Sequence, residues 1–505
     1  MSEDAPIIGE AAPPIPFRKI LIANRGEIVC RIVRTLREMG IGSVAIHHAV
    51  EAGARHVRVA DEAVQIIGET PVAAHLDGPQ IIEAARAIGA DAIHPGYGFL
   101  SESAGFARAV AEAGLTFIGP DAETIALMGD KISARAFAQA QGAPVVPSVA
   151  LSGDFDSFAN EAAKIGFPLI IKSAAGGGGK GMNIVRAAPD LREAARIAAS
   201  EALRYFGDGR IYAEAYLDRP RHIEVQVLGD GRGRAVHLFE RECSVQRRFQ
   251  KIIEEAPAPN LPTALRDRIC EVAVGIAAAA RYRNAGTIEF ILGADGRFFF
   301  LEMNTRLQVE HPVTEMITGL DLVRAQIEIA AGRGLPFAQD QISTTGHAIE
   351  CRICAENPEQ GFMPETGIVQ YLGIPDAPHI RFEHALDAGQ RIGTDFDPML
   401  AKLVTFGGNR AEAIARSIAA LEDLAILGVR TNGEYLARIL AHPAFAAGAL
   451  HTGFIAQFAA DLAPGAVDPA TLDRVVIAAA LGFHEFRDEA FGVPEPHAAI
   501  GRWRN

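Results

Sequence analysis

Short apolar runs alternate with segments of helical periodicity through the first part of the chain. The apolar runs have the length of buried strands, and the first helical segment stops at Gly40. Strands that alternate with helices predict a parallel, doubly wound sheet. The loop after the first strand reads Asn-Arg-Gly-Glu, not G-x-G-x-x-G, which argues against a dinucleotide site. The predicted strands are residues 17–23, 43–47 and 90–94, and the predicted helices are residues 28–39 and 78–88.

A glycine-rich segment, residues 176–181, separates two further predicted strands at 166–172 and 182–186. The sequence GGGGKG fits either a flexible linker or a mobile flap whose backbone N–H groups close over phosphates. The flanking strands and the nearby Lys172 and Lys180 favour the flap. The segment is not a Walker A loop, because glycine follows Lys180 where that motif has Ser or Thr for Mg²⁺.

Residues 220–226 alternate like a strand, which places His222, Glu224 and Gln226 on one face. Residues 240–255, ERECSVQRRFQKIIEE, then contain the densest basic cluster of the chain. This cluster is equally compatible with the solvated face of a helix and with an anion-binding pocket.

Residues 286–314 contain the strongest candidate for a functional site. Two strand-like runs, 287–292 and 298–304, flank the Asp-Gly pair at 295–296, which is a strong hairpin signal. With this pair at the centre of the turn, Glu289 lies directly opposite Glu302, about 5 Å away. Two carboxylates that close require a shared proton or a cation between them.

Asn304 and Arg306 share the strand face of Glu302, because side chains alternate along a strand. Hard oxygen ligands beside a fixed positive charge predict a site for Mg²⁺ carrying a polyphosphate. The alternative is an ordinary solvated hairpin, since strand register can slip by one residue.

A third region, from about residue 346, contains short strands separated by Gly, Pro and Asp, which predicts a small β-rich domain. From about residue 459 the composition becomes Ala/Pro-rich and helical. The predicted strands are 347–356, 366–372, 379–384 and 400–406, followed by a helix at 410–421.

Composition bounds the class of protein. The 505 residues are enough for about three domains, and no apolar run is long enough to span a bilayer, so no membrane association is expected. The net charge of −14 argues against nucleic-acid binding and requires local positive pockets for anionic ligands. Five cysteines fit a reducing compartment, so a cytoplasmic location is expected. Only seven of the 48 basic residues are lysines, which suggests specific roles for them, such as phosphate binding.

Nine motifs resemble those of biotin carboxylase, an ATP-grasp enzyme, and the resemblance covers roughly residues 17–457. The motifs are IANRGEI, HPGYGFLSE, FIGP, MGDK, GGGGKGM, PRHIEVQVL, EAPAP, EMNTRLQVEHPVTEMITG and ECRI. The resemblance implies an α/β ATP-grasp fold with a Rossmann-like parallel-sheet N-terminal domain and a β-rich C-terminal domain. The implied parts are a disordered tail (1–16), the N-terminal domain (17–130), the ATP-grasp domain (131–345, with a flap subdomain at about 145–215), the C-terminal domain (346–457) and a helical tail that begins a connecting region (458–505).

The resemblance also implies roles for residues at matching positions. The ATP-binding positions are Lys131, Lys172, Gly178, Gly179, Glu214, Leu217, His222 and Gln246. The Mg²⁺ or Mn²⁺ positions are Glu289, Glu302 and Asn304. The bicarbonate and biotin positions are Lys251, Arg306, Gln308, Val309 and Arg352, and the catalytic positions are Arg306, Glu310, Lys251 and Arg352.

The implied reaction is ATP-dependent carboxylation of biotin by bicarbonate through carboxyphosphate, the first half-reaction of an acyl-CoA carboxylase. In that reaction Glu310 deprotonates bicarbonate, and Arg352 stabilises the biotin enolate. Biotin is expected in trans on a carrier protein or domain, because the chain contains no Met-Lys-Met-type motif and no lysine beyond Lys402. A carboxyltransferase subunit and a homodimer are implied as partners, with the helix that holds Arg31, Arg34 and Glu38 as the expected dimer contact.

The chain departs from the family pattern at three places. Phe249 stands where the family usually has His, Ala215 stands where it usually has Lys, and HHAVEAGARHV lacks the usual Ser/Asp-rich turn. Phe249 cannot hydrogen-bond a ribose hydroxyl and Ala215 cannot donate to a purine, and each lost bond is worth about 1 kcal/mol. A weaker or less selective nucleotide site is therefore expected.

Two alternative functions stay open at this point. One is another ATP-grasp ligase, against which the ECRI motif with Arg352 and the RLQVEHPVTE motif argue. The other is a catalytically silent regulatory subunit, against which the presence of Lys251, Arg306, Glu310 and Arg352 argues.

Overall fold

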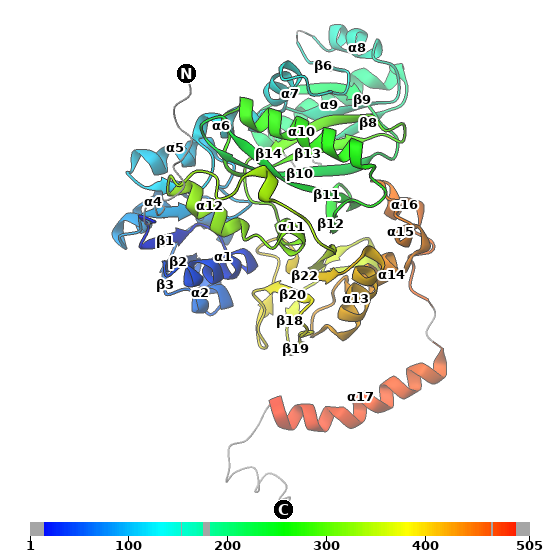
Figure 1. Ribbon diagram of the computed structural model, residues 1–505. Coiled ribbons are helices and arrows are strands. Elements are labelled where there is room, and N and C mark those ends of the chain that lie inside the picture. The colour runs from blue at the N-terminus through cyan, green and yellow to red at the C-terminus, as the bar shows by residue number, and fades with distance from the viewer. Residues whose placement is uncertain (1–14, 153, 175–181, 466–467, 491–505) are drawn as a thin grey trace, which may run out of the picture. The chain divides into compact units, whose positions relative to one another are not determined.

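The computed structural model describes residues 15–152, 154–174, 182–465 and 468–490. They form two compact units, the first extending to Leu462 and the second beginning at Ala463. The first unit contains three sheets of four or more strands and all the site residues discussed below (Figure 1).

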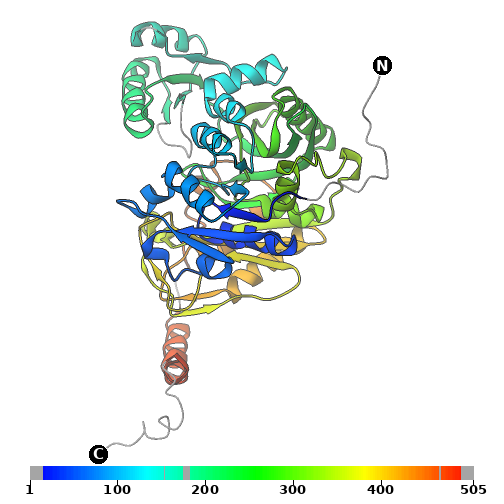
Figure 2. The same cartoon turned by 90° about the vertical axis from the view of Figure 1, so that its left-hand side faces the viewer.

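The first sheet is parallel. Helix α1 (Glu27–Glu38) packs its apolar side against one face, and α4 (Gly78–Ala87) and α5 (Ala104–Glu112) pack against the other (Figure 2). The prediction of a doubly wound sheet is confirmed. In spatial order the strands are β3 (Glu62–Gln65), β2 (Gly42–His47), β1 (Lys19–Ile22), β4 (Ala92–His94) and β5 (Thr116–Phe117).

A smaller four-stranded sheet lies in the region predicted to hold the flap. Helices α8 (Phe155–Ala163) and α9 (Ala188–Phe206) share an apolar core with it. The strands on either side of the glycine-rich segment pair antiparallel, as expected, while Gly178 and Gly179 lie outside the described residues. In spatial order the strands are β6 (Ser148–Ala150), β9 (Ile211–Ala215), β7 (Leu169–Ser173) and β8 (Asn183–Val185).

The largest sheet is antiparallel and has eight strands. Helix α10 (Thr263–Ala279) packs on its first strands through a buried apolar cluster. The sheet crosses the predicted boundary between residues 345 and 346, so the division into domains at that point stays a prediction. In spatial order the strands are β14 (Phe298–Asn304), β13 (Arg283–Leu292), β10 (Arg221–Asp230), β11 (Ala235–Arg247), β12 (Gln250–Ala256), β15 (His347–Cys354), β22 (Met399–Gly407) and β20 (Ile380–His384).

The single strand predicted at 366–372 is wrong, because the chain changes partner within it. Its first part, β18 (Gly367–Ile368), pairs with β21 (Arg391–Ile392), while the next, β19 (Tyr371–Gly373), pairs with β23 (Ala425–Leu427). Val369 lies between them and is completely buried. A short pair, β16 (Glu356–Asn357) and β17 (Met363–Pro364), and the helices α13 (Arg410–Asp423) and α14 (Gly433–Ala441) complete this region.

The hairpin between β13 and β14 has the predicted pairing but a different turn. Gly293 donates to the Arg297 carbonyl at 2.8 Å, so the loop has three residues, 294–296, and Gly296 adopts the left-handed φ of 78° that such loops favour. The register then shifts between Glu289 and Phe290. This bulge restores the predicted partners, and Glu289 lies opposite Glu302. The prediction of a two-residue turn is therefore wrong, although the pairing is confirmed.

The basic segment 240–255 is a hairpin of β11 and β12, so the helical alternative is wrong. Its turn consists of Arg248 and Phe249, both with positive φ, 48° and 68°. Side chains alternate along each strand, so the basic residues of this segment do not form one continuous charged face. Arg247 and Lys251 both line the pocket described below.

The remaining helices connect these layers or extend beyond them. The helical expectation for the last part of the chain is confirmed by α17. None of the helices in the described part of the chain has the length and apolar character that crossing a membrane requires. The bounds are α2 (Arg55–Val59), α3 (Pro71–His75), α6 (Ala122–Gly129), α7 (Lys131–Ala140), α11 (His311–Thr318), α12 (Leu322–Ala330), α15 (Pro443–Ala446), α16 (Phe454–Gln457) and α17 (Pro469–Ala490), with 3₁₀ turns at Ala49–Glu51, Gln339–Gln341 and Pro358–Gln360.

Candidate active site

A pocket of about 560 Å³ opens between the four-stranded sheet and the eight-stranded sheet. Every predicted site residue in the described part of the chain lines it, with the exception of Glu310, which is completely buried. The lining residues among those predicted are Lys131, Lys172, Glu214, Leu217, His222, Gln246, Lys251, Glu289, Glu302, Asn304, Arg306, Gln308, Val309 and Arg352.

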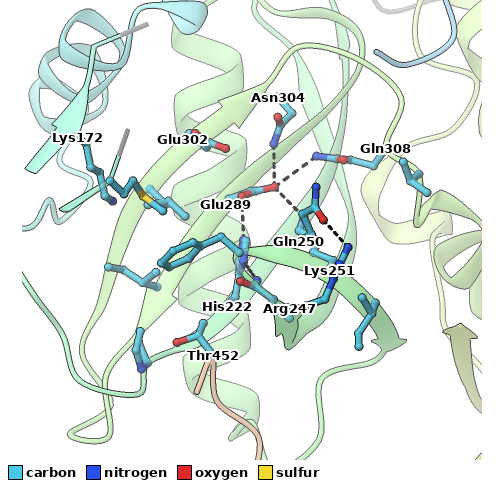
Figure 3. Close-up of a pocket in the computed structure, with 18 of the residues that line it drawn as sticks. Lys172, His222, Arg247, Gln250, Lys251, Glu289, Glu302, Asn304, Gln308 and Thr452 are labelled. Carbon is cyan, nitrogen blue, oxygen red and sulfur yellow. Dashed lines mark hydrogen bonds and ion pairs between the residues drawn. The ribbon is translucent and has the colours of Figure 1, made fainter. Parts of the chain in front are cut away.

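Glu289 lies at the centre of a set of donors, as Figure 3 shows. His222 Nε2 donates to its Oε2 at 2.8 Å, and Lys251 Nζ and Asn304 Nδ2 donate to its Oε1, each at 2.8 Å. Gln308 adds a longer contact of 3.4 Å. Burial alone would raise the pKa of this carboxyl, but Lys251 and His222 outweigh burial and hold the pKa well below its usual range.

Glu302, directly opposite, has a different environment. Lys131 Nζ lies 3.2 Å from its Oε2, and its side chain is 28% exposed to the pocket. Burial would lower the pKa of Lys131, but Glu302 outweighs this effect and raises it, so the ammonium stays charged. Lys131 is the first residue of α7.

Lys251, on β12, compensates three carboxylates at once. Its Nζ donates to Glu224 Oε2 at 2.5 Å, to Glu289 Oε1 at 2.8 Å and to Glu310 Oε1 at 2.7 Å. Burial would lower the pKa of Lys251, but these carboxylates raise it well above its usual value. A compact ammonium with three donors suits this position, because each hydrogen can address a different carboxylate.

Glu310, the residue just before α11, is held from both sides. Lys251 donates to one carboxylate oxygen, and Arg352 Nη2 donates to the other at 2.8 Å. Burial would raise the pKa of Glu310, but Lys251 and Arg352 lower it well below its usual value. Glu310 is therefore an ionised carboxylate at neutral pH, directly behind the two cations that line the pocket.

Arg352, on β15, is shared between Glu310 and Glu254. Its Nε donates to Glu254 Oε1 at 2.7 Å. Burial raises the pKa of Glu254 to about 7, against the lowering effect of Arg352. Arg352 thus faces one firmly ionised carboxylate and one whose charge changes near neutral pH.

Arg306 follows β14 and spans the other side of the pocket. Its Nε donates to Glu102 Oε2 at 3.0 Å, its Nη1 to Gln308 Oε1 at 2.9 Å and its Nη2 to Asn304 Oδ1 at 3.3 Å. Glu102 also accepts from the backbone N–H of Thr305 at 3.1 Å. These contacts orient the guanidinium beside the Glu289 cluster, where a planar fork of donors can bind a carboxylate-like anion.

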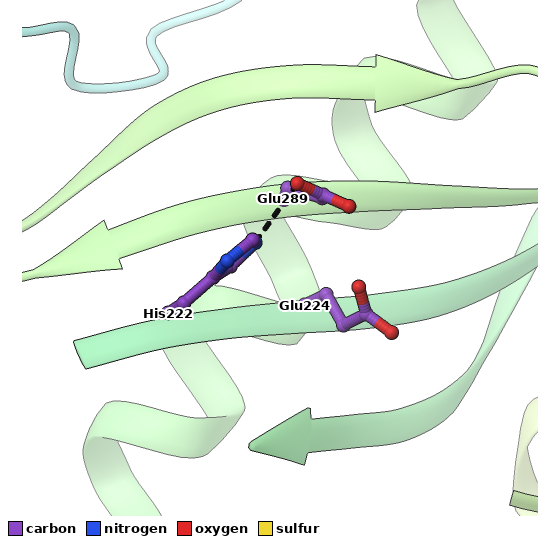
Figure 4. Close-up of side chains that lie close together, drawn as sticks. All are labelled: His222, Glu224 and Glu289. Carbon is purple, nitrogen blue, oxygen red and sulfur yellow. Dashed lines mark hydrogen bonds and ion pairs between the residues drawn. The ribbon is translucent and has the colours of Figure 1, made fainter. Parts of the chain in front are cut away.

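His222 and Glu224 lie on β10 and Glu289 on the neighbouring β13, and His222 points toward Glu289, as Figure 4 shows. Gln246 Nε2 lies 2.6 Å from His222 Nδ1, which leaves the Nε2–H of His222 to donate to Glu289. Burial would lower the pKa of His222, but Glu289 outweighs burial and raises it. Ligand atoms of the three side chains lie within 4.8 Å of one another, but Lys251 already supplies a positive charge there.

Lys172 reaches the pocket from the four-stranded sheet. Its Nζ lies 2.5 Å from Glu214 Oε1, and Arg135 Nη1 donates to the other oxygen of Glu214 at 3.0 Å. Glu214 is almost completely buried, and Leu217 follows it at the rim of the same pocket.

Several residues of this network were not in the predicted set. Glu224 lies on the strand face already recognised, where its closeness to Lys251 could have been inferred, and Glu102 lies within the HPGYGFLSE motif. Arg135, Arg241 and Glu254 had no sequence signal, because their partners are distant in the chain. Arg241 is completely buried and donates to Glu224 Oε1 at 2.5 Å.

Three pocket residues offer oxygen ligands to a divalent cation. Glu289 and Glu302 offer carboxylate oxygens and Asn304 an amide oxygen, which are ligands that Mg²⁺ and Mn²⁺ prefer. Asn304 uses its NH₂ toward Glu289, so its oxygen faces the pocket side, where Arg306 reaches it. The residues therefore fit a hard divalent cation.

The pocket lies between two sheets. The eight-stranded antiparallel sheet carries the carboxylates, and the four-stranded sheet carries Lys172, a lysine predicted to bind phosphate. This arrangement is that of the ATP-grasp ligases. Three family profiles then match the chain. They are the N-terminal domain of biotin carboxylase (residues 16–125), the ATP-binding domain of the carbamoyl-phosphate synthase L chain (130–338) and the C-terminal domain of biotin carboxylase (350–457).

The chain belongs to the biotin carboxylase family. It is 48% identical over 442 residues to the biotin carboxylase of Halalkalibacterium halodurans, covering 87% of this chain and 97% of that protein. It is 48% identical over 460 residues to the mitochondrial methylcrotonoyl-CoA carboxylase subunit alpha of Arabidopsis thaliana, covering 90% of this chain and 63% of that subunit. The chain thus spans about three fifths of the length of the methylcrotonoyl-CoA carboxylase relatives.

Solved structures agree with this assignment. The biotin carboxylase domain dimer of the Hydrogenobacter thermophilus 2-oxoglutarate carboxylase, solved with MgADP, ADP and bicarbonate, has a TM-score of 0.87 at 42% identity, over 89% of this chain and 99% of that one. The biotin carboxylase of Campylobacter jejuni, solved with an ATP complex, has a TM-score of 0.85 at 41% identity, over 88% and 99%. The ATP-grasp fold and the ligase class of the sequence prediction are therefore confirmed.

Proposed function

We propose that the chain uses ATP and bicarbonate to carboxylate biotin on a carrier, as the first half-reaction of an acyl-CoA carboxylase. The observation that carries this proposal is the environment of Glu310. Its carboxylate is completely buried behind the pocket, with Lys251 on one oxygen and Arg352 on the other. Such a group is ionised and desolvated, so it can accept a proton from an anion bound beside it.

Bicarbonate binds among Lys251, Arg306 and Gln308, the pocket residues that offer donors next to Glu310. While Lys251 and Arg352 face Glu310, they hold its pKa low, which makes it a weak base. When bicarbonate binds, the Lys251 ammonium also interacts with this anion, and its stabilisation of the Glu310 carboxylate weakens. The pKa of Glu310 then rises toward that of bicarbonate, and the proton moves to Glu310.

The deprotonated bicarbonate oxygen attacks the γ-phosphorus of ATP, and ADP leaves, giving carboxyphosphate. Lys131 and Lys172 hold the phosphates by charge, a role that phosphoryl transfer needs more than covalent chemistry. A divalent cation at Glu289, Glu302 and Asn304 would neutralise charge on the β- and γ-phosphates. Leu217, Glu214, His222 and Gln246 lie where the nucleoside binds in this proposal.

Carboxyphosphate then breaks down to CO₂ and phosphate. Phosphate takes the ureido proton of biotin, and the ureido nitrogen attacks CO₂ to give carboxybiotin. Arg352 stabilises the enolate formed in this step, because its guanidinium lines the pocket and can leave one of its two carboxylate partners.

The partners are proposed on the same basis. Biotin arrives in trans on a carrier protein or domain, and a carboxyltransferase subunit uses the product, as the similarity to methylcrotonoyl-CoA carboxylase subunits supports. A homodimer is supported by the dimer named for a structure at 42% identity. A cytoplasmic location is supported by the five free cysteines.

One residue of the expected dimer contact is unsuited to that role. Arg31 is almost completely buried and bonds Glu315 and Asp321 of its own chain, at 2.7 Å and 2.8 Å. Arg34 and Glu38 keep 47% and 56% of their side chains exposed. The proposed contact on α1 therefore reduces to these two residues.

The test measures ATP hydrolysis with and without bicarbonate and with free biotin. We expect bicarbonate-dependent turnover that free biotin stimulates, and Glu310→Gln is expected to lower it by about 10²-fold or more while leaving ATP binding intact. Glu434→Gln, a substitution at a 93% exposed side chain, serves as the matched control. Turnover without stimulation by biotin would favour another ATP-grasp ligase, and no turnover would favour a silent subunit.

A further inference from the structure

The backbone carbonyl groups of residues 307–310 accept hydrogen bonds from protein donors. The Leu307 carbonyl accepts from Arg306 Nη1 at 3.3 Å, and the Gln308 carbonyl accepts from His311 Nδ1 at 2.7 Å. These two contacts are local in sequence. Among the described residues, the backbone N–H groups of Val309 and Glu310 donate to no protein acceptor. A segment with its carbonyls engaged and its N–H groups free is suited to an anion.

The Val309 carbonyl differs from its neighbours, because its donor comes from far away in the chain. Lys402 Nζ, on β22, donates to it at 3.0 Å. Val309 lines the pocket, whereas Lys402 is completely buried and is absent from the pocket lining. The carbonyl therefore points away from the pocket, toward the interior.

Lys402 is held by groups from the first sheet as well. Its Nζ lies 3.2 Å from Glu27 Oε1, on α1, and the Tyr97 hydroxyl donates to the same carboxylate. The Tyr97 ring centroid lies 5.7 Å from Nζ. Lys402 thus links β22, α1, the loop after β4 and the segment before α11.

Other titratable groups also face this buried ammonium. Glu350 on β15 is completely buried, and neither of its oxygens has a hydrogen-bond partner within the described part of the chain. Glu383 on β20 lies directly opposite Lys402 in the strand pairing. Burial would raise the pKa of Glu383, but Arg381 and Arg34 hold it well below its usual range. In contrast, burial raises the pKa of Glu27 to about 7 and that of Glu350 well above its usual value. The closest partners of the Lys402 ammonium are the Val309 carbonyl at 3.0 Å and Glu27 at 3.2 Å.

We propose that Lys402 is a positioning residue for the anion site: it keeps the Val309 carbonyl turned away from the pocket. The Val309 carbonyl and the Glu310 N–H belong to one planar peptide and point in opposite directions, so the same contact also aims this N–H. Without Lys402 the carbonyl oxygen can turn toward the pocket, where its negative end opposes a bound anion. This inference rests on the proposed function, in which the anion is bicarbonate.

The test compares Lys402→Met with Lys164→Met, a matched control at a lysine that is 69% exposed. ATP hydrolysis yields the KM for bicarbonate and the KM for ATP separately. Lys402→Met is expected to raise the bicarbonate KM by about tenfold, the worth of one charge-assisted hydrogen bond, while the ATP KM changes less than about twofold. Lys402→Arg, which can still donate to Val309, is expected to give an intermediate bicarbonate KM.

An unchanged bicarbonate KM, or an equal rise of both KM values, would overturn the inference. If Lys402→Met does not fold, Lys402→Arg decides alone: a raised bicarbonate KM with an unchanged ATP KM supports the role, and an unchanged bicarbonate KM overturns it. Amide hydrogen exchange gives a readout that needs no turnover. Exchange of residues 306–311 is expected to rise in Lys402→Met and not in Lys164→Met. If the wild type shows no bicarbonate-dependent turnover, the proposed function fails, and the exchange result still decides the role of Lys402.

Discussion

Glu289 and Glu302 lie directly opposite each other on β13 and β14, yet only Glu289 is neutralised by several protein donors. Glu289 is buried and accepts from His222, Lys251 and Asn304, whereas the described contact of Glu302 is Lys131 at 3.2 Å. The close carboxylate pair expected from the sequence is thus compensated asymmetrically. Glu302, 28% exposed to the pocket, is the carboxylate that remains available to a cation.

This asymmetry predicts different results for two substitutions. Glu302→Gln is expected to raise the Mn²⁺ concentration for half-saturation by about tenfold, since one charged ligand is lost, while thermal stability changes little. Glu289→Gln is expected to lower stability as well, because it removes the carboxylate partner of His222 and one of the three buried carboxylates around Lys251. Mn²⁺ binding followed by electron paramagnetic resonance, together with thermal melts, checks both. Equal metal affinity in Glu302→Gln and wild type would remove Glu302 from the cation site.

Replacing Phe249 by histidine is predicted to increase the affinity for ATP. The Phe249 side chain is 49% exposed, lines the pocket and sits at the tip of the β11–β12 hairpin with φ 68°. Histidine tolerates this left-handed region better than most residues and adds a hydrogen-bonding ring. Phe249→His is expected to tighten ATP binding by about fivefold, the worth of one net hydrogen bond. Titration calorimetry measures it, and Phe249→Leu is the control that removes the ring without adding a polar group. No tightening with His would refute the role assigned to this position.

Replacing Arg31 by methionine is predicted to lower the stability of the folded protein. The Arg31 guanidinium is 2% exposed and bonds both Glu315, within α11, and Asp321, the residue just before α12. Arg31→Met removes the shared cation of the buried Glu315 and the partly exposed Asp321, while Glu315 keeps Arg381, and it is expected to cost about 3 kcal/mol. Arg34→Met removes a 47% exposed guanidinium whose buried partner, Glu383, keeps Arg381, and it is expected to cost about 1 kcal/mol or less. Thermal melts rank the two variants, and a milder effect for Arg31 would contradict the prediction.

The titration of Glu254 is predicted to make the stability of the folded protein depend on pH. Burial raises the pKa of Glu254 from 4.5 to about 7 in the folded protein, against the effect of Arg352. Between these two values the folded state binds more protons than the unfolded state, so this group's contribution to stability falls as pH rises through that window. Glu254→Gln cannot titrate. The melting temperature of the wild type relative to Glu254→Gln is therefore expected to fall between about pH 5 and pH 8. A constant or rising difference would contradict the assigned pKa.

Local pattern predicted the elements whose signals are short in sequence. The apolar runs of the first sheet and the pairing of Glu289 with Glu302 are confirmed. Even there, the predicted turn was wrong by one residue, and only a bulge restored the pairing. A bulge is set by packing against β10 on the other side of β13, which local sequence does not describe.

Where the chain changes sheets, the pattern was insufficient. The run 366–372 divides between β21 and β23, which belong to two different sheets. This outcome depends on partner strands that are distant in sequence. The basic segment 240–255 forms a hairpin within one sheet, where its charged residues fit the pattern of a helix face equally well.

The sequence by itself determined the parallel first sheet, the acidic hairpin, the scarce lysines and, through its motifs, the family. These follow from side-chain periodicity and from residues that lie close together in the chain. Only the tertiary structure decided that Lys251 joins three carboxylates, that Arg352 is shared between Glu254 and Glu310, and that Lys402 holds the Val309 carbonyl. These contacts join residues between 27 and 98 positions apart, and a buried charge finds its partner by sheet packing and desolvation, which no local pattern encodes.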